Sequence, residues 1–251
     1  MDLSIIIPAH NEVDKIAGDV RAAGAFLREH GLRGEVIVVD DGSEDATASR
    51  AESAGQGESG EHVEVRVLRF EENRGKGAAV RSGVLESRGQ YVMFADSGEC
   101  VPYEYAWRGL EILREGGCEI AHGSRKLAET RVVRRPRWHR RVASRMFRWF
   151  VGWFVGAPGH LTDTQVGFKL YRGEAARELY GACRSERFMF DMEIILRAGR
   201  RGYRICEFPI EWHSDRDTRF SFVRHSWMSF WDLVEMKRRL AREWREESAT
   251  R

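Results

Sequence analysis

A repeated unit, in which an apolar strand ends in a polar turn and a helix follows, constrains the fold of this 251-residue chain most strongly. Strands are expected at 3–8, 35–39, 63–70 and 91–95, and helices at 15–30, from about 44 and from about 73. The first two strands are apolar almost throughout, which is typical of strands that are covered on both faces. The pattern therefore predicts an α/β fold, with a mostly parallel, doubly wound sheet and flanking helices. The stretch 56–62, which is rich in Gly, Ser and Glu, is expected to be an exposed loop.

Polar side chains follow three of these strands directly. Asn11 and Glu12 come after the first strand, Asp40 and Asp41 after the second, and Asp96 after the fourth. In an open α/β sheet, ligands bind at the carboxyl ends of the strands. Carboxylates and amides in this position can accept hydrogen bonds from the hydroxyl groups and base of a nucleotide. A ligand site at this edge is expected, although an ordinary turn rich in Asp, Ser and Gly accounts equally well for the residues around Asp96.

Helix starts offer a second interpretation of the acidic turns. Asp41 or Ser43 could cap the helix that follows them, and Asp191 and Glu193 could be the acids that favour a helix N-terminus. The turn at 75–77, Gly-Lys-Gly, precedes another helix and would present a cation and backbone N–H groups to an anion. Such tripeptides are also common in turns without a function.

The composition indicates one large domain with an appendage and argues against several other classes of protein. The four cysteines, at 100, 118, 183 and 206, have no metal-ligand spacing, so free thiols in a reducing compartment are expected. The N-terminus lacks the features of a signal peptide, and no run approaches the ~18 apolar residues that span a bilayer. A cytoplasmic location is expected, with any membrane contact made from one side.

One segment is strongly basic, although the net charge of the whole chain is only +2. Residues 125–148 hold nine Arg, one Lys and one Glu, and aromatic residues follow with helical spacing. An amphipathic helix at about 138–156 in a membrane interface would explain both features, whereas a core or dimer-packing helix would explain the aromatic residues alone. Because guanidinium groups match phosphate oxygens, Arg131, Arg134, Arg135 and Arg137 are candidates to bind an anionic acceptor. No nucleic-acid-binding motif accompanies the charge, so nucleic acid is not expected as a partner.

Several motifs, taken in order, resemble one family. They are Ser-Ile-Ile-Ile-Pro-Ala-His-Asn-Glu at 4–12, Val-Asp-Asp-Gly-Ser at 39–43, Asn-Arg-Gly-Lys-Gly at 73–77, Asp-Thr-Gln-Val-Gly-Phe-Lys at 163–169, Phe-Asp-Met-Glu at 190–193 and the segment 202–212. In order and spacing they resemble the inverting family 2 glycosyltransferases, which have a GT-A fold. The later segments resemble the branch that acts on polyprenyl phosphates, the dolichyl-phosphate β-glucosyltransferases. The resemblance covers roughly residues 3–212.

The resemblance implies a binding site for a nucleoside-diphosphate sugar. The donor-binding residues would be Pro8, Ala9, Asn11, Glu12, Asp40, Asp41, Lys76, Gly77, Arg81, Asp96 and Ser97. The acceptor-binding residues would be Arg125, Arg131, Arg134, Arg135, Gln165 and Lys169. Asp96, Asp163 and Asp191 would be the catalytic carboxylates, which hold a cation, orient the substrates or, for a hydroxyl acceptor, act as the base.

The metal site departs from the family pattern. Asp96 would be the first acid of the Asp-X-Asp motif, which holds Mg²⁺ or Mn²⁺ against the diphosphate, but Gly98 stands where the second acid belongs. Asp96 alone, or together with Glu99, would hold the cation with the help of phosphates and water. The alternatives are transfer without a metal, in which Lys and Arg supply the positive charge, and loss of activity.

The expected reaction is inverting transfer of a sugar, with UDP-glucose as the first choice of donor, to a polyprenyl phosphate. A phosphate acceptor is largely ionised at neutral pH, because its second pKa is about 6, and it needs no strong base. Two alternatives stay open. One is a glycosyltransferase of the same fold with a soluble acceptor, and the other is a catalytically silent protein that binds nucleotide sugars.

The expected organisation is a GT-A domain at 1–212 and an amphipathic helical appendage at 213–251. Within the domain, the donor half reaches to about 125 and the acceptor half runs from about 126. The C-terminal helix would either flank the first amphipathic helix on the membrane or pack on the domain. Contact of the amphipathic helices with lipid would place the protein peripherally at the inner face of the membrane, as a monotopic partner. Exposed aromatic residues on these helices leave room for a homo-oligomer.

Overall fold

A computed structural model describes residues 1–132, 161–213 and 222–249. A seven-stranded sheet runs through its centre in the order β3-β2-β1-β4-β7-β5-β8. The strands are β1 (Leu3–Ala9), β2 (Gly34–Asp40), β3 (Val63–Arg69), β4 (Tyr91–Ala95), β5 (Ile120–Ser124), β7 (Phe168–Arg172) and β8 (Ile205–Pro209), and a separate parallel pair is formed by β6 (Arg131–Val132) and β9 (Glu211–Trp212). β7 is antiparallel to its neighbours β4 and β5, and the other described pairs of the large sheet are parallel. The predicted α/β fold with a mostly parallel sheet is confirmed.

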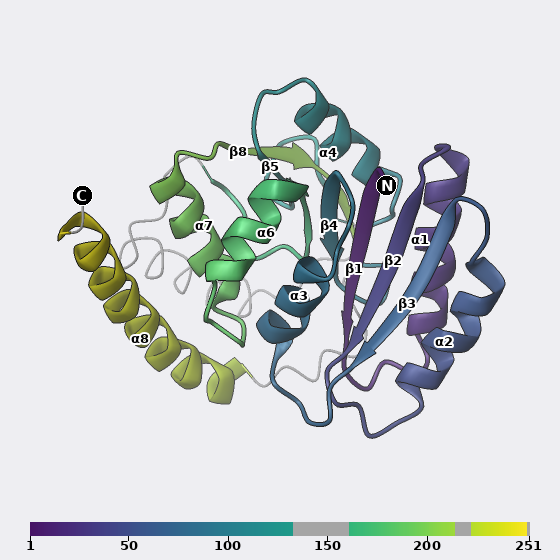
Figure 1. Cartoon of the computed structure of the whole chain (residues 1–251), viewed down its shortest axis with the longest axis horizontal. Coiled ribbons are helices and arrows are strands. Elements are labelled where there is room, and N and C mark those ends of the chain that lie inside the picture. The colour runs from purple at the N-terminus through teal and green to yellow at the C-terminus, as the bar shows by residue number, and fades with distance from the viewer. Residues whose placement is uncertain (133–160, 214–221, 250–251) are drawn as a thin grey trace.

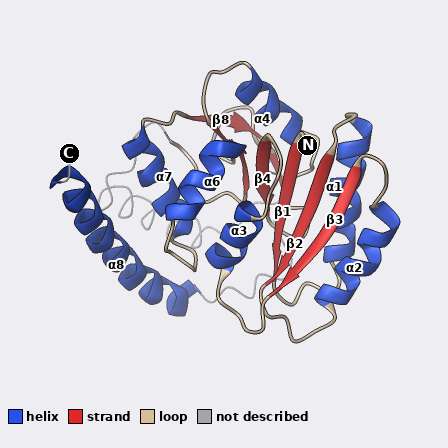
Figure 2. Ribbon diagram, viewed as in Figure 1, coloured by secondary structure: helices blue, strands red, loops and turns tan. Residues whose placement is uncertain are grey.

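Helices cover both faces of this sheet (Figures 1 and 2). On one face lie α1 (Ile16–Glu29), α2 (Thr47–Glu58) and α4 (Tyr105–Arg114), and on the other lie α3 (Lys76–Leu85), α6 (Gly173–Ala182), α7 (Phe190–Arg201) and α8 (Phe222–Ala249). The strands send alternate side chains to two cores, so that Ile5 and Ile7 of β1 belong to the first core and Ile6 to the second. Burial on both faces is the reason that β1 and β2 are apolar at most positions.

Helix α2 is longer than the sequence indicated. It continues to Glu58, so the expected loop at 56–62 is wrong for residues 56–58. A small residue allows the helix to lie close to β3, because a Cβ atom added to Gly55 would stand 2.8 Å from Cγ1 of Val65. Close packing on the sheet outweighs the low helix propensity of glycine at this position.

Several side chains of α8 pack on the domain. Leu233, Met236 and Leu240 are buried in the second core, whereas Trp231 on the same helix is 53% exposed. The amphipathic helix that we expected at 138–156 lies outside the described residues. In the part of the chain that is described, no helix combines the length and the hydropathy needed to cross a membrane.

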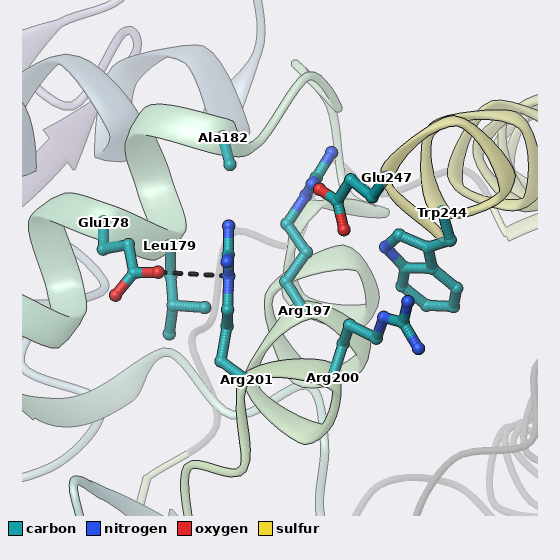
Figure 3. Close-up of a pocket in the computed structure, with 8 residues that line it drawn as sticks. All are labelled: Glu178, Leu179, Ala182, Arg197, Arg200, Arg201, Trp244 and Glu247. Carbon is teal, nitrogen blue, oxygen red and sulfur yellow. Dashed lines mark ion pairs between the residues drawn. The ribbon is translucent and has the colours of Figure 1, made fainter. Parts of the chain in front are cut away.

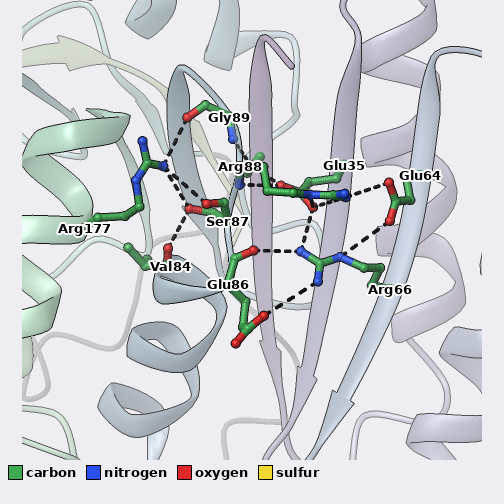
Figure 4. Close-up of polar contacts among 10 residues, drawn as sticks. Glu35, Glu64, Arg66, Val84, Glu86, Ser87, Arg88, Gly89 and Arg177 are labelled. Atoms are coloured by element: carbon green, nitrogen blue, oxygen red, sulfur yellow. Dashed lines mark hydrogen bonds and ion pairs between the residues drawn. The ribbon is translucent and has the colours of Figure 1, made fainter.

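Glu35 joins three strands at the amino end of the parallel strands (Figure 4). Its buried carboxylate accepts hydrogen bonds from Ser4 Oγ at 2.6 Å, from the backbone N–H of Arg88 at 2.7 Å and from Nη2 of Arg66 at 2.7 Å. Burial raises the pKa of Glu35, but these donors outweigh burial and hold the pKa below its usual value. Glu35 therefore has a structural role, at the edge of the sheet opposite the strand ends that carry the candidate site.

Candidate active site

The turns after β1 and β2 lie against each other at the carboxyl edge of the sheet. Pro8 and Ala9 are the last residues of β1, and Asn11 has a left-handed backbone with φ of 55°. The backbone N–H of Asn11 donates to Ser43 Oγ at 2.8 Å. This bond brings the predicted donor residues after the two strands together in one place.

Asp41 anchors the turn that leads into α3. Its Oδ1 accepts a hydrogen bond from the backbone N–H of Arg74 at 2.7 Å, and its Oδ2 accepts one from that of Gly75 at 2.9 Å. The cap position of α2 is Ala46, which makes no side-chain cap bond, so the interpretation of Asp41 or Ser43 as the cap of this helix is wrong. Asp41 instead builds the turn that precedes Lys76.

Lys76 and Asp96 form an ion pair at the carboxyl end of β4. Both side chains are partly exposed, 24% for Lys76 and 36% for Asp96, so the pair is within reach of a ligand. The backbone N–H of Asp96 donates to the carbonyl of Gly167 at 2.9 Å, and a Cβ atom added to Gly167 would lie 2.0 Å from the Asp96 carboxylate. Burial lowers the pKa of Lys76, but the charges of Asp96 and Asp191 outweigh burial and raise it, so the ammonium group stays charged.

Some backbone donors at the start of α3 are already used within the protein. The N–H of Gly75 is bonded to the preceding acidic turn, and that of Ala78 donates to the carbonyl of Glu186 at 2.9 Å. A Cβ atom added to Gly77 would stand 2.6 Å from a carbonyl oxygen of the same loop. The ammonium group of Lys76 is therefore the main feature that this turn can offer to an anion.

A second ion pair joins Lys169 of β7 to Asp191 of α7. Both lysines lie over the ring of Phe94, with Nζ of Lys76 5.8 Å and Nζ of Lys169 5.6 Å from its centroid. Burial raises the pKa of Asp191 and lowers that of Lys169, and the charge of each partner opposes the shift of the other. Asp191 does lie in the first turn of α7, as the helix-start interpretation proposed, but its carboxylate contacts Lys169.

Glu193 on the same helix connects three segments. Its buried carboxylate accepts hydrogen bonds from the backbone N–H groups of Arg184 and Ser185, at 3.0 and 2.9 Å. Arg197 Nε donates to it at 2.8 Å, and Nη2 of Arg239 in α8 donates at 2.6 Å. The loop that covers the start of α3 is therefore bonded through Glu193 to the C-terminal helix.

Arg125 and Asp163 form a third pair, at the carboxyl end of β5. The fully buried Asp163 accepts hydrogen bonds from Nε and Nη2 of Arg125 at 2.6 and 2.8 Å. Burial raises the pKa of Asp163, but Arg125 outweighs burial and lowers it. Burial lowers the pKa of Arg125, but the charges of Asp163 and, more weakly, of Asp96 outweigh burial and raise the pKa. Asp163 is thus an ionised partner that fixes a guanidinium group near Asp96.

Asp19 of α1 holds the turn after Asp96 and was not singled out from the sequence. Its carboxylate accepts hydrogen bonds from the backbone N–H of Gly98 at 2.9 Å and from that of Glu99 at 3.0 Å. Burial raises the pKa of Asp19 to about 6, although these two bonds oppose the shift. Oε1 of Glu99 faces α1, 2.9 Å from the position of a Cβ atom on Gly18. The one signal for Asp19 in the sequence is its place on the apolar side of a helix.

The described residues offer a divalent cation an incomplete site. They contain no cluster of three or more His, Cys, Asp or Glu side chains that could hold a metal ion. Asp96 stands at the strand end, and Glu99 is directed toward Gly18. A cation would fit at Asp96 only with phosphate and water oxygens as further ligands, which Mg²⁺ and Mn²⁺ accept.

The other predicted residues have varied positions. Asp40 accepts a hydrogen bond from the backbone N–H of Ser43 at 3.1 Å, and Glu12 forms an ion pair with Lys15 at 3.1 Å. Ser97 and Gln165 are partly buried in turns. Arg81 is partly buried on α3, and Arg131 is exposed in β6. Arg134, Arg135 and Arg137 lie outside the described residues.

A pocket between α6, α7 and α8 lies apart from these ion pairs (Figure 3). Its arginines are already engaged, since Nε of Arg201 lies 3.0 Å from Glu178 and the guanidinium carbon of Arg200 lies 5.7 Å from the centroid of the Trp244 ring. No residue that lines it belongs to the strand ends described above. It is therefore not the candidate active site.

Comparison with protein families identifies the chain's relatives. The family model described as glycosyl transferase family 2 matches residues 4–180. The chain belongs to this family. As a member of glycosyl transferase family 2 it is an enzyme of the glycosyltransferase class, as the motifs predicted.

Several curated proteins are similar over nearly the whole chain. The dolichyl-phosphate beta-glucosyltransferase of Drosophila melanogaster is 32% identical over 257 residues, which are 97% of this chain and 74% of the relative. The proteins of the same name from Saccharomyces cerevisiae and Homo sapiens are each 31% identical, with 92% and 93% of this chain and 73% and 72% of the relatives matched. The predicted resemblance to this branch of the family is confirmed.

Solved structures also share the fold. Glucosyl-3-phosphoglycerate synthase from Mycobacterium tuberculosis, in complex with Mn²⁺, UDP and glucosyl-3-phosphoglycerate, matches with a TM-score of 0.68 at 18% identity and covers 94% of this chain and 79% of that one. The same enzyme with Mn²⁺, UDP-glucose and phosphoglyceric acid matches with a TM-score of 0.70 at 18% identity. At this identity the likeness shows the GT-A fold alone.

Proposed function

We propose that this glycosyltransferase transfers glucose, with inversion at the anomeric carbon, from UDP-glucose to a polyprenyl phosphate of the dolichyl phosphate type. The names of the curated relatives, which match almost the whole chain, support this substrate pair. The observation that carries the proposal is that the Lys76–Asp96 pair and the fixed guanidinium of Arg125 share one edge of the sheet. That edge can receive two anionic substrates side by side.

The donor diphosphate is proposed to lie against Lys76, whose ammonium group would neutralise charge on the departing UDP. Asn11, Glu12, Asp40 and Asp41, after β1 and β2, would line the nucleoside side of the same edge. A divalent cation held by Asp96 and the phosphates of the donor would supply further positive charge to the leaving group.

The acceptor phosphate is proposed to bind at Arg125, with Arg131, Arg134 and Arg135 as further cations. Its oxygen attacks the anomeric carbon from the face opposite UDP, so that one C–O bond forms while the bond to UDP breaks. Because the acceptor is ionised at neutral pH, no side chain has to remove a proton. This agrees with the lowered pKa of Asp163, which makes that residue a poor base. Asp191 would instead orient Lys169 toward the substrates.

We further propose that the protein acts as a peripheral partner of the inner membrane face, where a lipid-linked acceptor is available. The arginine-rich segment 125–148 and the aromatic residues that follow it support contact with lipid headgroups.

The proposal is tested by incubation with radiolabelled UDP-glucose and a short-chain polyprenyl phosphate, with Mn²⁺ or with EDTA. The unphosphorylated polyprenol is the matched control, because it has the same chain but cannot bind through phosphate. Label in the lipid phase with the phosphate alone is the expected result. UDP release without labelled lipid would indicate a soluble acceptor, and UDP-glucose binding without turnover would indicate a silent binding protein. Either of these results would contradict the proposed function.

A further inference from the structure

The turn after β4 is held at two points. On one side, the backbone N–H of Asp96 donates to the carbonyl of Gly167 at 2.9 Å. Two residues later, the N–H groups of Gly98 and Glu99 donate to the carboxylate of Asp19, at 2.9 and 3.0 Å. Asp19 is fully buried and lies on α1, which is far from this turn in the sequence. The backbone on both sides of the Asp96 carboxylate is therefore fixed from outside the turn.

The conformation that Asp19 holds is unusual for side chains other than glycine. Gly98 has φ of 90° and Glu99 has φ of 46°, both in the left-handed region. In this conformation the N–H groups of both residues point to the same side, where the carboxylate of Asp19 accepts both. A second acid at position 98, which the family motif calls for, would have to adopt a strained backbone here.

Few kinds of group could hold this turn. A neutral side chain with one oxygen can accept both N–H groups, but an apolar side chain would leave two partly buried donors without this partner, which is costly. An ionised Asp19 in this place carries its own desolvation cost, increased by the nearby charges of Glu99 and Glu12. Asp19 is nevertheless an acid at a fully buried position, and its carboxylate accepts both N–H groups.

We propose that Asp19 is a positioning residue for Asp96, which sets the direction of the Asp96 carboxylate toward Lys76 and the donor diphosphate. This inference rests on the proposed function for the identity of the ligand. It assigns to a residue on α1 the task of ordering a turn that lacks the second acid of the motif.

The test compares D19A, which removes the acceptor, with D19N, which keeps one side-chain oxygen for the two N–H groups. UDP affinity is measured by calorimetry with and without Mn²⁺, and hydrogen exchange is followed in the peptide that contains residues 96–100. We expect D19A to weaken UDP binding at least tenfold and to lose protection in this peptide, with unchanged protection elsewhere. We expect D19N to stay within about threefold of the parent protein, because the hydrogen bonds and not the charge hold the turn.

A second variant, G98A, perturbs the same turn without touching the core, so it keeps the test valid if D19A does not fold. Its Cβ atom disfavours the left-handed backbone, and we expect a loss of UDP affinity similar to that of D19A. The inference is overturned if D19A or G98A binds UDP as the parent does, or if D19N and D19A lose affinity equally. A parent protein that binds no UDP would contradict the proposed function. The exchange of residues 96–100 in D19A and D19N would still decide whether Asp19 holds the turn.

Discussion

Both carboxylate oxygens of Asp163 are bonded to Arg125, with Nε at 2.6 Å from Oδ2 and Nη2 at 2.8 Å from Oδ1. Because this arrangement keeps the pKa of Asp163 below its usual value, we expect it to hold the arginine in place rather than to take up a proton. D163N should therefore lower kcat/KM for the polyprenyl phosphate about tenfold to a hundredfold, the equivalent of one charge-assisted hydrogen bond. Initial rates at varied acceptor concentration measure this, with the KM for UDP-glucose as an internal control. A limb of the pH–rate profile that disappears in D163N would instead identify Asp163 as the base.

Lys76 is ion-paired with Asp96, and its pKa is raised, so its ammonium group is charged at neutral pH. K76M should lower kcat about a hundredfold, the usual loss when one donor to a developing negative charge is removed. K76R keeps the charge and is the matched variant, with a smaller expected loss. Single-turnover rates with radiolabelled UDP-glucose measure the effect. Equal activity of K76M and the parent would exclude Lys76 from the donor site.

Gly167 leaves room for the Asp96 carboxylate, which lies 2.0 Å from where a Cβ atom would stand. G167A should weaken UDP binding and lower the free energy of unfolding by about 1–3 kcal/mol, the usual cost of overpacking. The matched control is G199A in α7, where nothing lies within 4 Å of the added atom. Alanine should stabilise that helix by about 0.5–1 kcal/mol. Denaturant unfolding measures the free energy of unfolding of both variants, and UDP titration measures their UDP affinity. A G167A protein with unchanged UDP affinity would contradict the packing argument.

Glu35 stabilises the amino end of the parallel strands only while it is ionised (Figure 4). Its folded-state pKa is lowered, so its contribution is present above the unfolded value near 4.5 and is lost as the pH falls through the folded value. E35Q should lower the free energy of unfolding by about 2 kcal/mol at pH 7, as for a hydrogen-bonded charge. The difference from the parent should shrink below pH 4.5. Urea unfolding between pH 3 and pH 7 measures it, and a difference that is constant with pH would show that ionisation is unimportant.

Arg239 of α8 reaches Glu193 at 2.6 Å, and Glu193 binds the loop that covers the start of α3. R239M should therefore raise the Kd for UDP about threefold to tenfold, although it changes no residue of the site. The neighbouring R238M is the control, because Arg238 is exposed. If the two variants bind UDP alike, the connection through Glu193 has no effect on the donor site.

Much of the fold was predictable from the sequence because burial on both faces leaves a clear pattern. The apolar runs predicted β1, β2 and β4, and the polar residue after β4 marked the place of Asp96. The partners of these residues were not predictable, because hydrogen bonds between distant segments leave no periodic signal. The pairs Asp41–Gly75, Asp163–Arg125 and Asp19–Gly98 are of this kind.

The position of β7 in the sheet limits where the chain of such an enzyme can be cut or recombined. This strand comes from the second half of the chain, yet it is inserted between β4 and β5 of the first half. A cut near residue 125 would expose the edges of β4 and β5 and separate Gly167 from Asp96. The segments before and after residue 125, which we predicted to bind the donor and the acceptor, are thus interleaved in the sheet, and neither can be exchanged between homologues by recombination at that boundary without opening the middle of the sheet.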